Sequence, residues 1–238
     1  MSLDPPKQLI WDDVSIGRFW AYYAGQPQFY FSYQQGDAVL AQIKPIIGAS
    51  AAVLDYGCGP GHFLTKLLDA GFRVTGADLS LETMGPARDK GAGRQGFDGI
   101  FTIADLIARG QKFDAVFLLE VVEHLSDGHL AATLENARHL LAPGGKLIVT
   151  TPNEENLSDS MVYCPVSNLV FHRWQHMRSW SKETLAASLR RHGFSSLDIQ
   201  TCTFESIADA QSPKPRQLMR RLMARFRKPQ SLLAIAQL

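Results

Sequence analysis

The sequence is poor in cysteine and has neither a long apolar run nor an apolar leader. Its three cysteines, Cys58, Cys164 and Cys202, are odd in number and lack the spacing of zinc ligands, so we expect reduced thiols rather than a disulfide framework. No apolar run approaches the roughly 18 residues that a membrane-spanning helix needs. Residues 1–8 hold two prolines but no apolar core of a signal peptide. These absences predict a globular, cytosolic protein.

Charges of the two signs nearly balance but are unevenly distributed. The 238 residues carry 24 lysines and arginines, 23 aspartates and glutamates and a net charge of +1. Seven of the positive charges follow Asp209, the last acid, so the rest of the chain has 17 basic and 23 acidic residues. Nucleic acid is a disfavoured partner for such an acidic body. At this length we expect one well-buried domain.

Composition divides the chain into three parts. We predict an aromatic-rich helical cap at residues 1–48, the core at 49–211 and a basic amphipathic tail at 212–238. The rings of the cap either cover the edge of a sheet or form a lid over a substrate or cofactor. The tail either touches an anionic membrane peripherally or docks on the body, with RNA as a third partner.

From residue 51 onward, short runs rich in valine, isoleucine and phenylalanine alternate with helical patterns. This alternation predicts an α/β fold, a doubly wound, Rossmann-like, mostly parallel sheet with helices on both faces. A helix is expected at residues 181–192, and residues 151–174 are expected to form a loop that carries specificity. The expected strands lie near residues 51–56, 72–77, 98–103, 113–119, 145–151 and 194–204.

A glycine-rich turn joins the first of these strands to a helix, in the segment Asp-Tyr-Gly-Cys-Gly-Pro-Gly-His that begins at Asp55. Glycines let a ligand approach the backbone, which is typical of a nucleotide-type site. His62 stands where the dinucleotide fingerprint needs its third glycine, so NAD is disfavoured. A carboxylate at Asp55 suits a cationic ligand, and Asp78, ending the next strand, can accept hydrogen bonds from ribose hydroxyls.

These features resemble the class I S-adenosylmethionine-dependent methyltransferases, over residues 50–200. The resemblance continues in the segments that begin Phe113-Asp114, Leu119-Glu120 and Leu141-Ala142. It implies that S-adenosylmethionine is the cofactor, with Asp105 and Leu106 beside its adenine. The cofactor-binding residues that it implies are Asp55, Tyr56, Gly57, Gly59, Gly61, Asp78, Leu79, Asp105, Leu106 and Leu119.

Four candidate catalytic residues complete the predicted site: Glu120, Glu123, His124 and His176. Their Glu-x-x-Glu-His pattern with a distant histidine resembles the ubiquinone-biosynthesis O-methyltransferases and the small-RNA terminal 2′-O-methyltransferases. In those groups the resemblance implies that the acids and histidines hold a divalent cation, which polarises the acceptor hydroxyl. The favoured alternative here has no metal, and His124 or His176 is then the natural general base.

The predicted activity is methyl transfer from S-adenosylmethionine to a hydroxyl of a small molecule or glycolipid. The expected partner is therefore a small-molecule or lipid-linked acceptor, and we expect Asn153, Tyr163 and Arg173 to line its site. Two alternatives remain open. One is a non-catalytic regulatory protein that binds S-adenosylmethionine, and the other is a metal-dependent RNA terminal 2′-O-methyltransferase.

Overall fold

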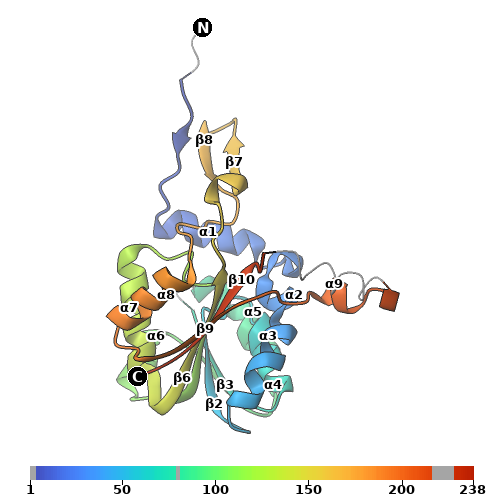
Figure 1. The fold of residues 1–238 in the computed structure, drawn as a ribbon, viewed down its shortest axis with the longest axis vertical. Coiled ribbons are helices and arrows are strands. Elements are labelled where there is room, and N and C mark those ends of the chain that lie inside the picture. The colour runs from blue at the N-terminus through green and yellow to red at the C-terminus, as the bar shows by residue number, and fades with distance from the viewer. Residues whose placement is uncertain (1–3, 79–80, 216–227) are drawn as a thin grey trace.

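A sheet of seven strands lies at the centre of the chain (Figure 1), of which the computed structural model describes residues 4–78, 81–215 and 228–238. The first five strands in spatial order are parallel, and β10 runs antiparallel to both of its neighbours. The predicted doubly wound, mostly parallel fold is confirmed. In spatial order the strands are β4 (Phe97–Phe101), β3 (Arg73–Ala77), β2 (Ala52–Tyr56), β5 (Phe113–Leu119), β6 (Leu141–Pro152), β10 (Ser231–Gln237) and β9 (Ser196–Cys202).

Helices cover both faces of the sheet because successive side chains of a strand point to opposite faces. On β2, Val53 packs into one core cluster and Leu54 into the other. The central strands, such as β2 and β5, are therefore mostly apolar on both faces. Val53 shares its cluster with α3 (Gly36–Ile43), α4 (His62–Asp69) and α5 (Leu81–Gly91), and Leu54 shares its cluster with α6 (Ile103–Ala108), α7 (Asp127–Leu140) and α8 (Lys182–Arg191).

Strand order reverses between β2 and β5, which places an opening at the carboxyl ends of these strands. The amino-terminal segment lies across this opening (Figure 1). Its main helix, α1 (Asp13–Tyr23), begins with a capping box in which Asp12 and Ser15 each accept a hydrogen bond from the other's backbone N–H. The shorter elements that follow are η1 (Pro27–Phe29), α2 (Phe31–Gln34) and η2 (Lys44–Ile46).

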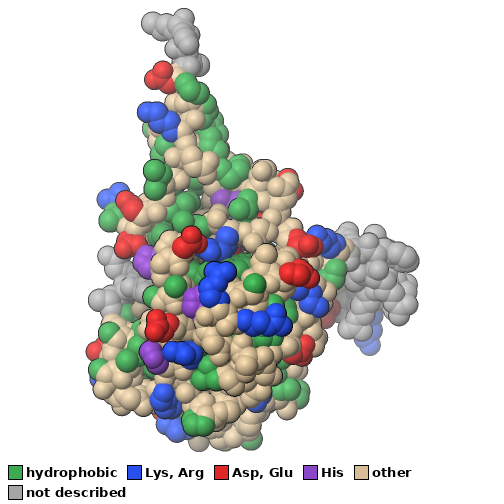
Figure 2. Space-filling model, turned by 60° about the vertical axis from the view of Figure 1, so that its left-hand side comes forward, with side chains coloured by type: hydrophobic (Ala, Val, Ile, Leu, Met, Phe, Trp, Pro, Cys, Tyr) green, Lys and Arg blue, Asp and Glu red, His purple; other side chains and the backbone are tan. Residues whose placement is uncertain are grey.

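Residues 151–174, expected to be a loop, contain a β-hairpin that projects from the body (Figure 1). After η3 (Leu157–Ser160), β7 (Met161–Cys164) pairs with β8 (Leu169–His172), and β1 (Lys7–Gln8) adds a parallel third strand. Of the prolines and asparagines that suggested a loop, Pro165 and Asn168 lie in the turn between β7 and β8, and the others precede β7. Apolar side chains remain exposed on the projection (Figure 2), among them Ile10 and Val166.

The predicted tail boundary is wrong for residues 231–237, because they form β10 in the interior of the sheet. Strand β10 is buried on both faces, so its side chains do not alternate between apolar and polar, and its pattern does not stand out. Most of the predicted basic helix lies at residues 216–227, outside the described residues. The segment before it contains the short α9 (Ile207–Ala210). No described helix is long and apolar enough to cross a membrane.

Candidate active site

The glycine turn after β2 adopts a backbone that side chains would obstruct. Gly57 and Gly61 have φ values of +84° and +79°, in the left-handed region that favours glycine. A Cβ on Gly57 would lie 2.8 Å from Cγ2 of Val121, and one on Gly61 would lie 2.8 Å from Cα of Ala87. The chain therefore needs glycine at both positions to make this close turn. The turn places the first residues of α4 at the opening.

Two acids stand at the ends of neighbouring strands beside this turn. Asp78 accepts a hydrogen bond of 2.8 Å from the backbone N–H of Gly59. Asp55 is buried, and among the residues that the structure describes its Oδ2 has no hydrogen-bond partner. Burial, with the negative charge of Asp78 adding to it, raises the pKa of Asp55 to about 7. A buried, unpaired carboxyl of this kind fits a ligand that brings its own positive charge.

One cavity of about 1060 Å³ joins these acids to Glu120, His124 and His176, whereas Glu123 is not among the lining residues that the structure describes. This volume is just above the usual range for ligand pockets, roughly 300–1,000 Å³, so it has room for a cofactor and an acceptor together. Its floor includes Asp55 and Asp78, and its far wall includes His124 and His176.

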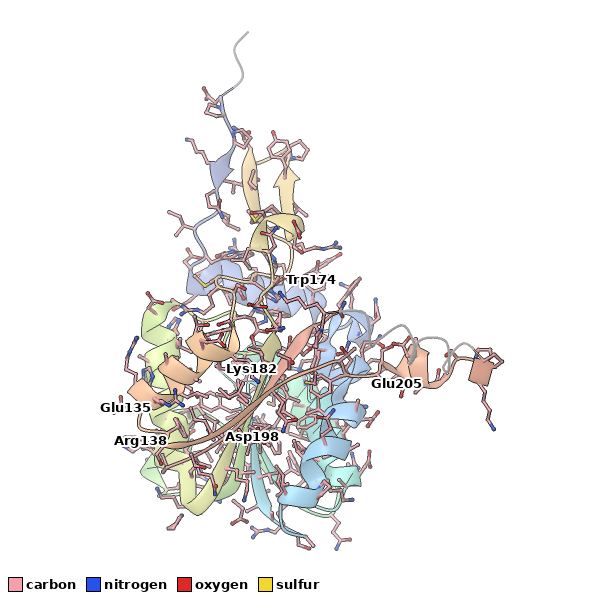
Figure 3. The ribbon with its side chains drawn as sticks, viewed as in Figure 1. Glu135, Arg138, Trp174, Lys182, Asp198 and Glu205 are labelled. Atoms are coloured by element: carbon pink, nitrogen blue, oxygen red, sulfur yellow. The ribbon has the colours of Figure 1, made fainter. Side chains whose placement is uncertain are left out.

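Aromatic rings of the amino-terminal cap roof this cavity. Trp20, Phe29 and Tyr30 line it together with Trp174 from the loop after β8. Trp174 lies next to α1 (Figure 3), and its ring centroid is 5.6 Å from that of Phe29. These four rings are placed as a lid over the cavity. Tyr22, by contrast, is 71% exposed and covers neither the cavity nor the edge of the sheet.

Two glutamates follow β5, of which Glu120 is half-buried and lines the cavity and Glu123 is buried. The backbone of Glu120 has a φ of +50°, a strained conformation that is common at functional sites. Glu123 accepts a hydrogen bond of 3.0 Å from Oγ1 of Thr151 through its Oε2. Within the described residues, Oε1 of each glutamate lacks a partner. Burial raises the pKa of Glu120 to about 7, and burial with the charge of Glu120 raises the pKa of Glu123.

Two histidines face these acids with one ring nitrogen already engaged. Nδ1 of His124 lies 3.4 Å from the carbonyl oxygen of Gln175, which can only accept, so Nδ1 carries the proton. Burial, with the nearby charge of His176 adding to it, lowers the pKa of His124 to about 3, so its ring is neutral and Nε2 keeps a lone pair. That Nε2 lies 3.8 Å from Oε1 of Glu123. The ring of His176 is 4.8 Å from that of His124.

These side chains fit a divalent cation. Glu123, His124 and His176 each offer one ligand atom, and the three atoms lie within 4.8 Å of one another. Imidazole nitrogen with carboxylate oxygen suits several divalent metals, and the orphaned carboxylate oxygens would gain a partner. Glu120, the fourth predicted ligand, lines the same cavity but lies outside this close group.

Asp105 and Leu106, the residues predicted beside the adenine, do not line the cavity as the structure describes it. The exposed Asp105 accepts a hydrogen bond of 2.8 Å from Oγ1 of Thr102 in the first turn of α6, and Leu106 is buried in the core. Neither is among the described residues that line the cavity, and nor is Gly61, whereas Tyr56 and Leu119 line it. Leu79 lies outside the described residues.

The three residues expected to line the acceptor site are also placed away from it, because the predicted loop turns outward as a hairpin. Asn153 donates to the carbonyl oxygen of Pro229, Tyr163 donates to Oδ1 of Asn168, and the guanidinium of Arg173 stacks on Trp174. None of the three is among the cavity-lining residues that the structure describes. Trp20, one of the predicted cap rings, lines it, as does Gln175, which the sequence did not indicate.

Comparison with known proteins assigns the family. A family model described as a methyltransferase domain matches residues 30–199. The chain belongs to that family. It is 31% identical over 175 residues to a ubiquinone biosynthesis O-methyltransferase of Cereibacter sphaeroides, covering 70% of this chain and 69% of that relative. It is 41% identical over 108 residues to an enzyme of the same name from Xylella fastidiosa, covering 44% of this chain and 43% of that relative.

The chain thus spans less than half of the length of the Xylella fastidiosa relatives that it matches. A solved S-adenosylmethionine-dependent methyltransferase from Archaeoglobus fulgidus shares the fold, with a TM-score of 0.57 and 19% identity over 94% of this chain and 99% of that one. The predicted class I S-adenosylmethionine-dependent methyltransferase family and fold are confirmed. S-adenosylmethionine is the cofactor of this class, and the glycine turn, Asp55 and Asp78 fit it.

Proposed function

We propose that this protein transfers a methyl group from S-adenosylmethionine to a hydroxyl of a small-molecule or lipid-linked acceptor. One observation carries the proposal: a single roofed cavity connects the glycine turn and its two acids to His124 and His176, and the buried Glu123 lies 3.8 Å from the ring of His124. The names of the curated relatives favour oxygen as the acceptor atom. The rings of Trp20, Phe29 and Trp174 favour an aromatic or apolar acceptor.

At the cofactor end, the residues of this chain bind and orient. The Asp55 carboxylate pairs with an ammonium group, and the Asp78 carboxylate, held by the N–H of Gly59, accepts hydrogen bonds from ribose hydroxyls. Trp20 and Trp174 exclude water from above. When bound, S-adenosylmethionine supplies a methyl carbon activated by its sulfonium, so alignment of the acceptor oxygen is the main requirement for an in-line displacement.

At the reacting end, His176 is the candidate base. As the acceptor oxygen bonds to the methyl carbon and the carbon–sulfur bond breaks, the hydroxyl proton passes to Nε2 of His176 or to solvent. His124 is a poor base, because burial lowers its pKa to about 3. In the metal-dependent alternative, Glu123, His124 and His176 would instead hold a divalent cation, with Glu120 nearby. Such a cation would polarise the acceptor oxygen as a Lewis acid, and the proton would then pass to solvent. The geometry thus favours the metal-dependent alternative more than the sequence did.

The first test is binding of S-adenosylhomocysteine, the product form of the cofactor. A ligand at 100 times its Kd adds about 2.7 kcal/mol of stability, which for a chain of this size raises Tm by roughly 5–10 °C. We expect a rise of this order and none with NADH. An unchanged Tm at millimolar S-adenosylhomocysteine would contradict the cofactor assignment.

The second test is transfer of labelled methyl from S-adenosylmethionine to phenols with and without an apolar tail, and to a short RNA with a free 3′ end. Each acceptor is assayed in EDTA and again with added Mg²⁺ or Mn²⁺. We expect transfer to phenols that depends on the cation. Transfer to RNA alone would favour the terminal 2′-O-methyltransferase alternative, and cofactor binding without transfer to any acceptor would favour the regulatory one.

A peripheral membrane contact through the basic tail remains a proposal from the sequence. Its arginines include Arg220, Arg221, Arg225 and Arg227, and each basic residue near an anionic surface contributes about 1 kcal/mol. Replacing these four by glutamine, which leaves β10 intact, should reduce sedimentation with anionic vesicles. Equal sedimentation of both proteins would reject the contact.

A further inference from the structure

A third glutamate, Glu155, lies between two histidines just behind the cavity wall. It follows β6, whereas His172 ends β8 and His176 comes four residues later. Oε2 of Glu155 lies 2.5 Å from Nδ1 of His176, and Oε1 lies 3.4 Å from Nε2 of His172. The two imidazole rings are stacked with centroids 4.7 Å apart. This group shares His176 with the group of Glu123 and His124.

The backbone fixes the tautomer of His172. Its Nδ1 accepts hydrogen bonds from the backbone N–H of Trp174 at 3.3 Å and of His176 at 3.1 Å. A backbone N–H can only donate, so Nδ1 holds a lone pair and the proton of the neutral ring sits on Nε2. Nε2 is the ring nitrogen of His172 that lies near Glu155. His172 is 3% exposed, and within the described chain its Nε2 makes no hydrogen bond of good geometry.

We propose that Glu155, backed by His172, is a positioning residue that fixes the orientation and tautomer of His176. The carboxylate accepts the Nδ1 proton of His176 through Oε2, while Oε1 faces the N–H of His172. His176 is then left with a lone pair on Nε2, as His124 is through the carbonyl oxygen of Gln175. Both histidines thus present the same nitrogen, ready to accept a proton or bind a cation.

The alternative for this group is a second cation site, because Glu155, His172 and His176 offer ligand atoms within 4.8 Å of one another. The tautomer of His172 argues against it. Binding a cation through Nε2 would require the proton to move to Nδ1, which would break both backbone hydrogen bonds in a buried turn. His176 also cannot give Nδ1 to a cation while Glu155 accepts its proton. The cation therefore belongs to the group of Glu123, His124 and His176.

The tautomers can be read directly by ¹⁵N NMR of protein labelled in its histidines. We expect His176 to carry its proton on Nδ1 and His172 on Nε2 in the wild type. In Glu155→Leu, which keeps the bulk but removes both acceptors, His176 should shift toward the Nε2 proton. In Glu155→Gln, the side-chain oxygen can still accept from His176, so the wild-type tautomer should return.

Glu154→Gln is the matched control, since it removes the neighbouring carboxylate, which pairs with Lys228 at 2.6 Å. Its histidine spectrum should equal that of the wild type. A wild-type His176 protonated on Nε2, or a tautomer unchanged by Glu155→Leu, would overturn the proposal. If Glu155→Leu does not fold, the wild type and Glu155→Gln decide, because a proton on Nε2 of His176 in either contradicts it.

A second readout is Mn²⁺ affinity, measured by titration of the full chain. Loss of a residue that orients a metal-binding histidine typically weakens metal binding by about 10–100-fold, so we expect that loss in Glu155→Leu and a smaller one in Glu155→Gln. His172→Asn, whose Oδ1 can still accept from the backbone, should change it little. A His172→Asn loss as large as that of Glu155→Leu would instead support the second cation site.

Only the effect of Glu155 on methyl transfer rests on the proposed function. The tautomer measurement needs neither an acceptor nor turnover. Correct tautomers with no methyl transfer would therefore reject the function and leave the role of Glu155 standing, whereas methyl transfer with the opposite tautomer would do the reverse.

Discussion

The two ends of the cavity both contain buried carboxylates, but they are surrounded differently. At the glycine turn, Asp55 has an oxygen without a partner among the described residues, and Asp78 is bonded to a backbone N–H. Near the other end, Glu123, which does not itself line the cavity, accepts a hydrogen bond from Thr151 on one oxygen, and its other oxygen lies 3.8 Å from Nε2 of His124. At the glycine turn, the positive charge that would pair with Asp55 must come from the ligand. At the other end, the nitrogens of His124 and His176 are available to bind a cation. Binding and reaction should therefore be separable by mutation.

The largest effect should come from removing His176. His176→Ala deletes a cation ligand or, where no cation occupies Nε2, the candidate base, and general acid–base catalysis alone is worth about 10²–10⁴-fold in rate. We expect kcat for methyl transfer to fall by at least that lower figure. The Kd for S-adenosylhomocysteine should stay within about twofold of the wild type. An equal loss of cofactor binding would show that the two ends are not separable.

The next effect concerns the opposite end. Asp78→Asn weakens hydrogen bonds from ligand hydroxyls to a charged group, each worth about 1.5–3 kcal/mol, so calorimetry should show a Kd for S-adenosylhomocysteine raised by about 10-fold or more. Mn²⁺ affinity should not change. A parallel loss of Mn²⁺ affinity would contradict the separation from this side.

Acidity should affect the two ends differently as well. Because burial raises the pKa of Asp55 to about 7, its carboxyl is protonated below that pH and cannot pair with an ammonium group. Affinity for S-adenosylhomocysteine should fall as pH drops from 8 to 6, by up to about tenfold per unit below the pKa. In Asp55→Asn the affinity should be low and nearly independent of pH. A wild-type affinity that is flat or rises on acidification would refute the assignment.

The smallest predicted effect lies in the roof. Nε1 of Trp20 donates a hydrogen bond of 3.1 Å to Oε1 of Gln175, whose amide donates at 2.9 Å to the carbonyl oxygen of His124. Trp20→Phe keeps an aromatic ring but loses that bond, worth about 0.5–1.5 kcal/mol. Thermal unfolding should show a Tm lower by a few degrees. A drop in kcat as large as that of His176→Ala would mean that the roof belongs to the chemistry.

The same contrast explains which residues could be predicted from the sequence. The glycine turn, Asp55 and Asp78 could be predicted. Each lies in a segment where a strand runs directly into a turn, and that local pattern indicates the carboxyl end of a strand. Asp105 was expected beside the adenine from the resemblance alone, and in the structure its carboxylate accepts from Thr102 at the start of α6. The parallel strands β2 to β6 were expected because apolar runs alternate with helical patterns along the sequence. Strand β10 comes from a distant segment and lies between β6 and β9, a position that no local pattern indicates.

At the reacting end, only part of the set could be predicted. Glu123 and His124 stand in one motif, and His176 was selected with them. Glu155, His172 and Gln175 were not, because their roles depend on how β8 returns against the loop after β6. The spacing of His172 and His176 by four residues was a signal, but in an extended hairpin and loop it does not have the meaning that it has on a helix.

The most direct test of the central claim is the effect of bound Mn²⁺ on the NMR relaxation of bound S-adenosylhomocysteine. If one cavity holds the cofactor at Asp55 and Asp78 and a cation at Glu123, His124 and His176, Mn²⁺ should strongly broaden the ligand resonances next to sulfur. His176→Ala should remove the broadening without releasing the ligand. Tight binding of S-adenosylhomocysteine that Mn²⁺ leaves unbroadened would contradict a reacting centre at these three residues.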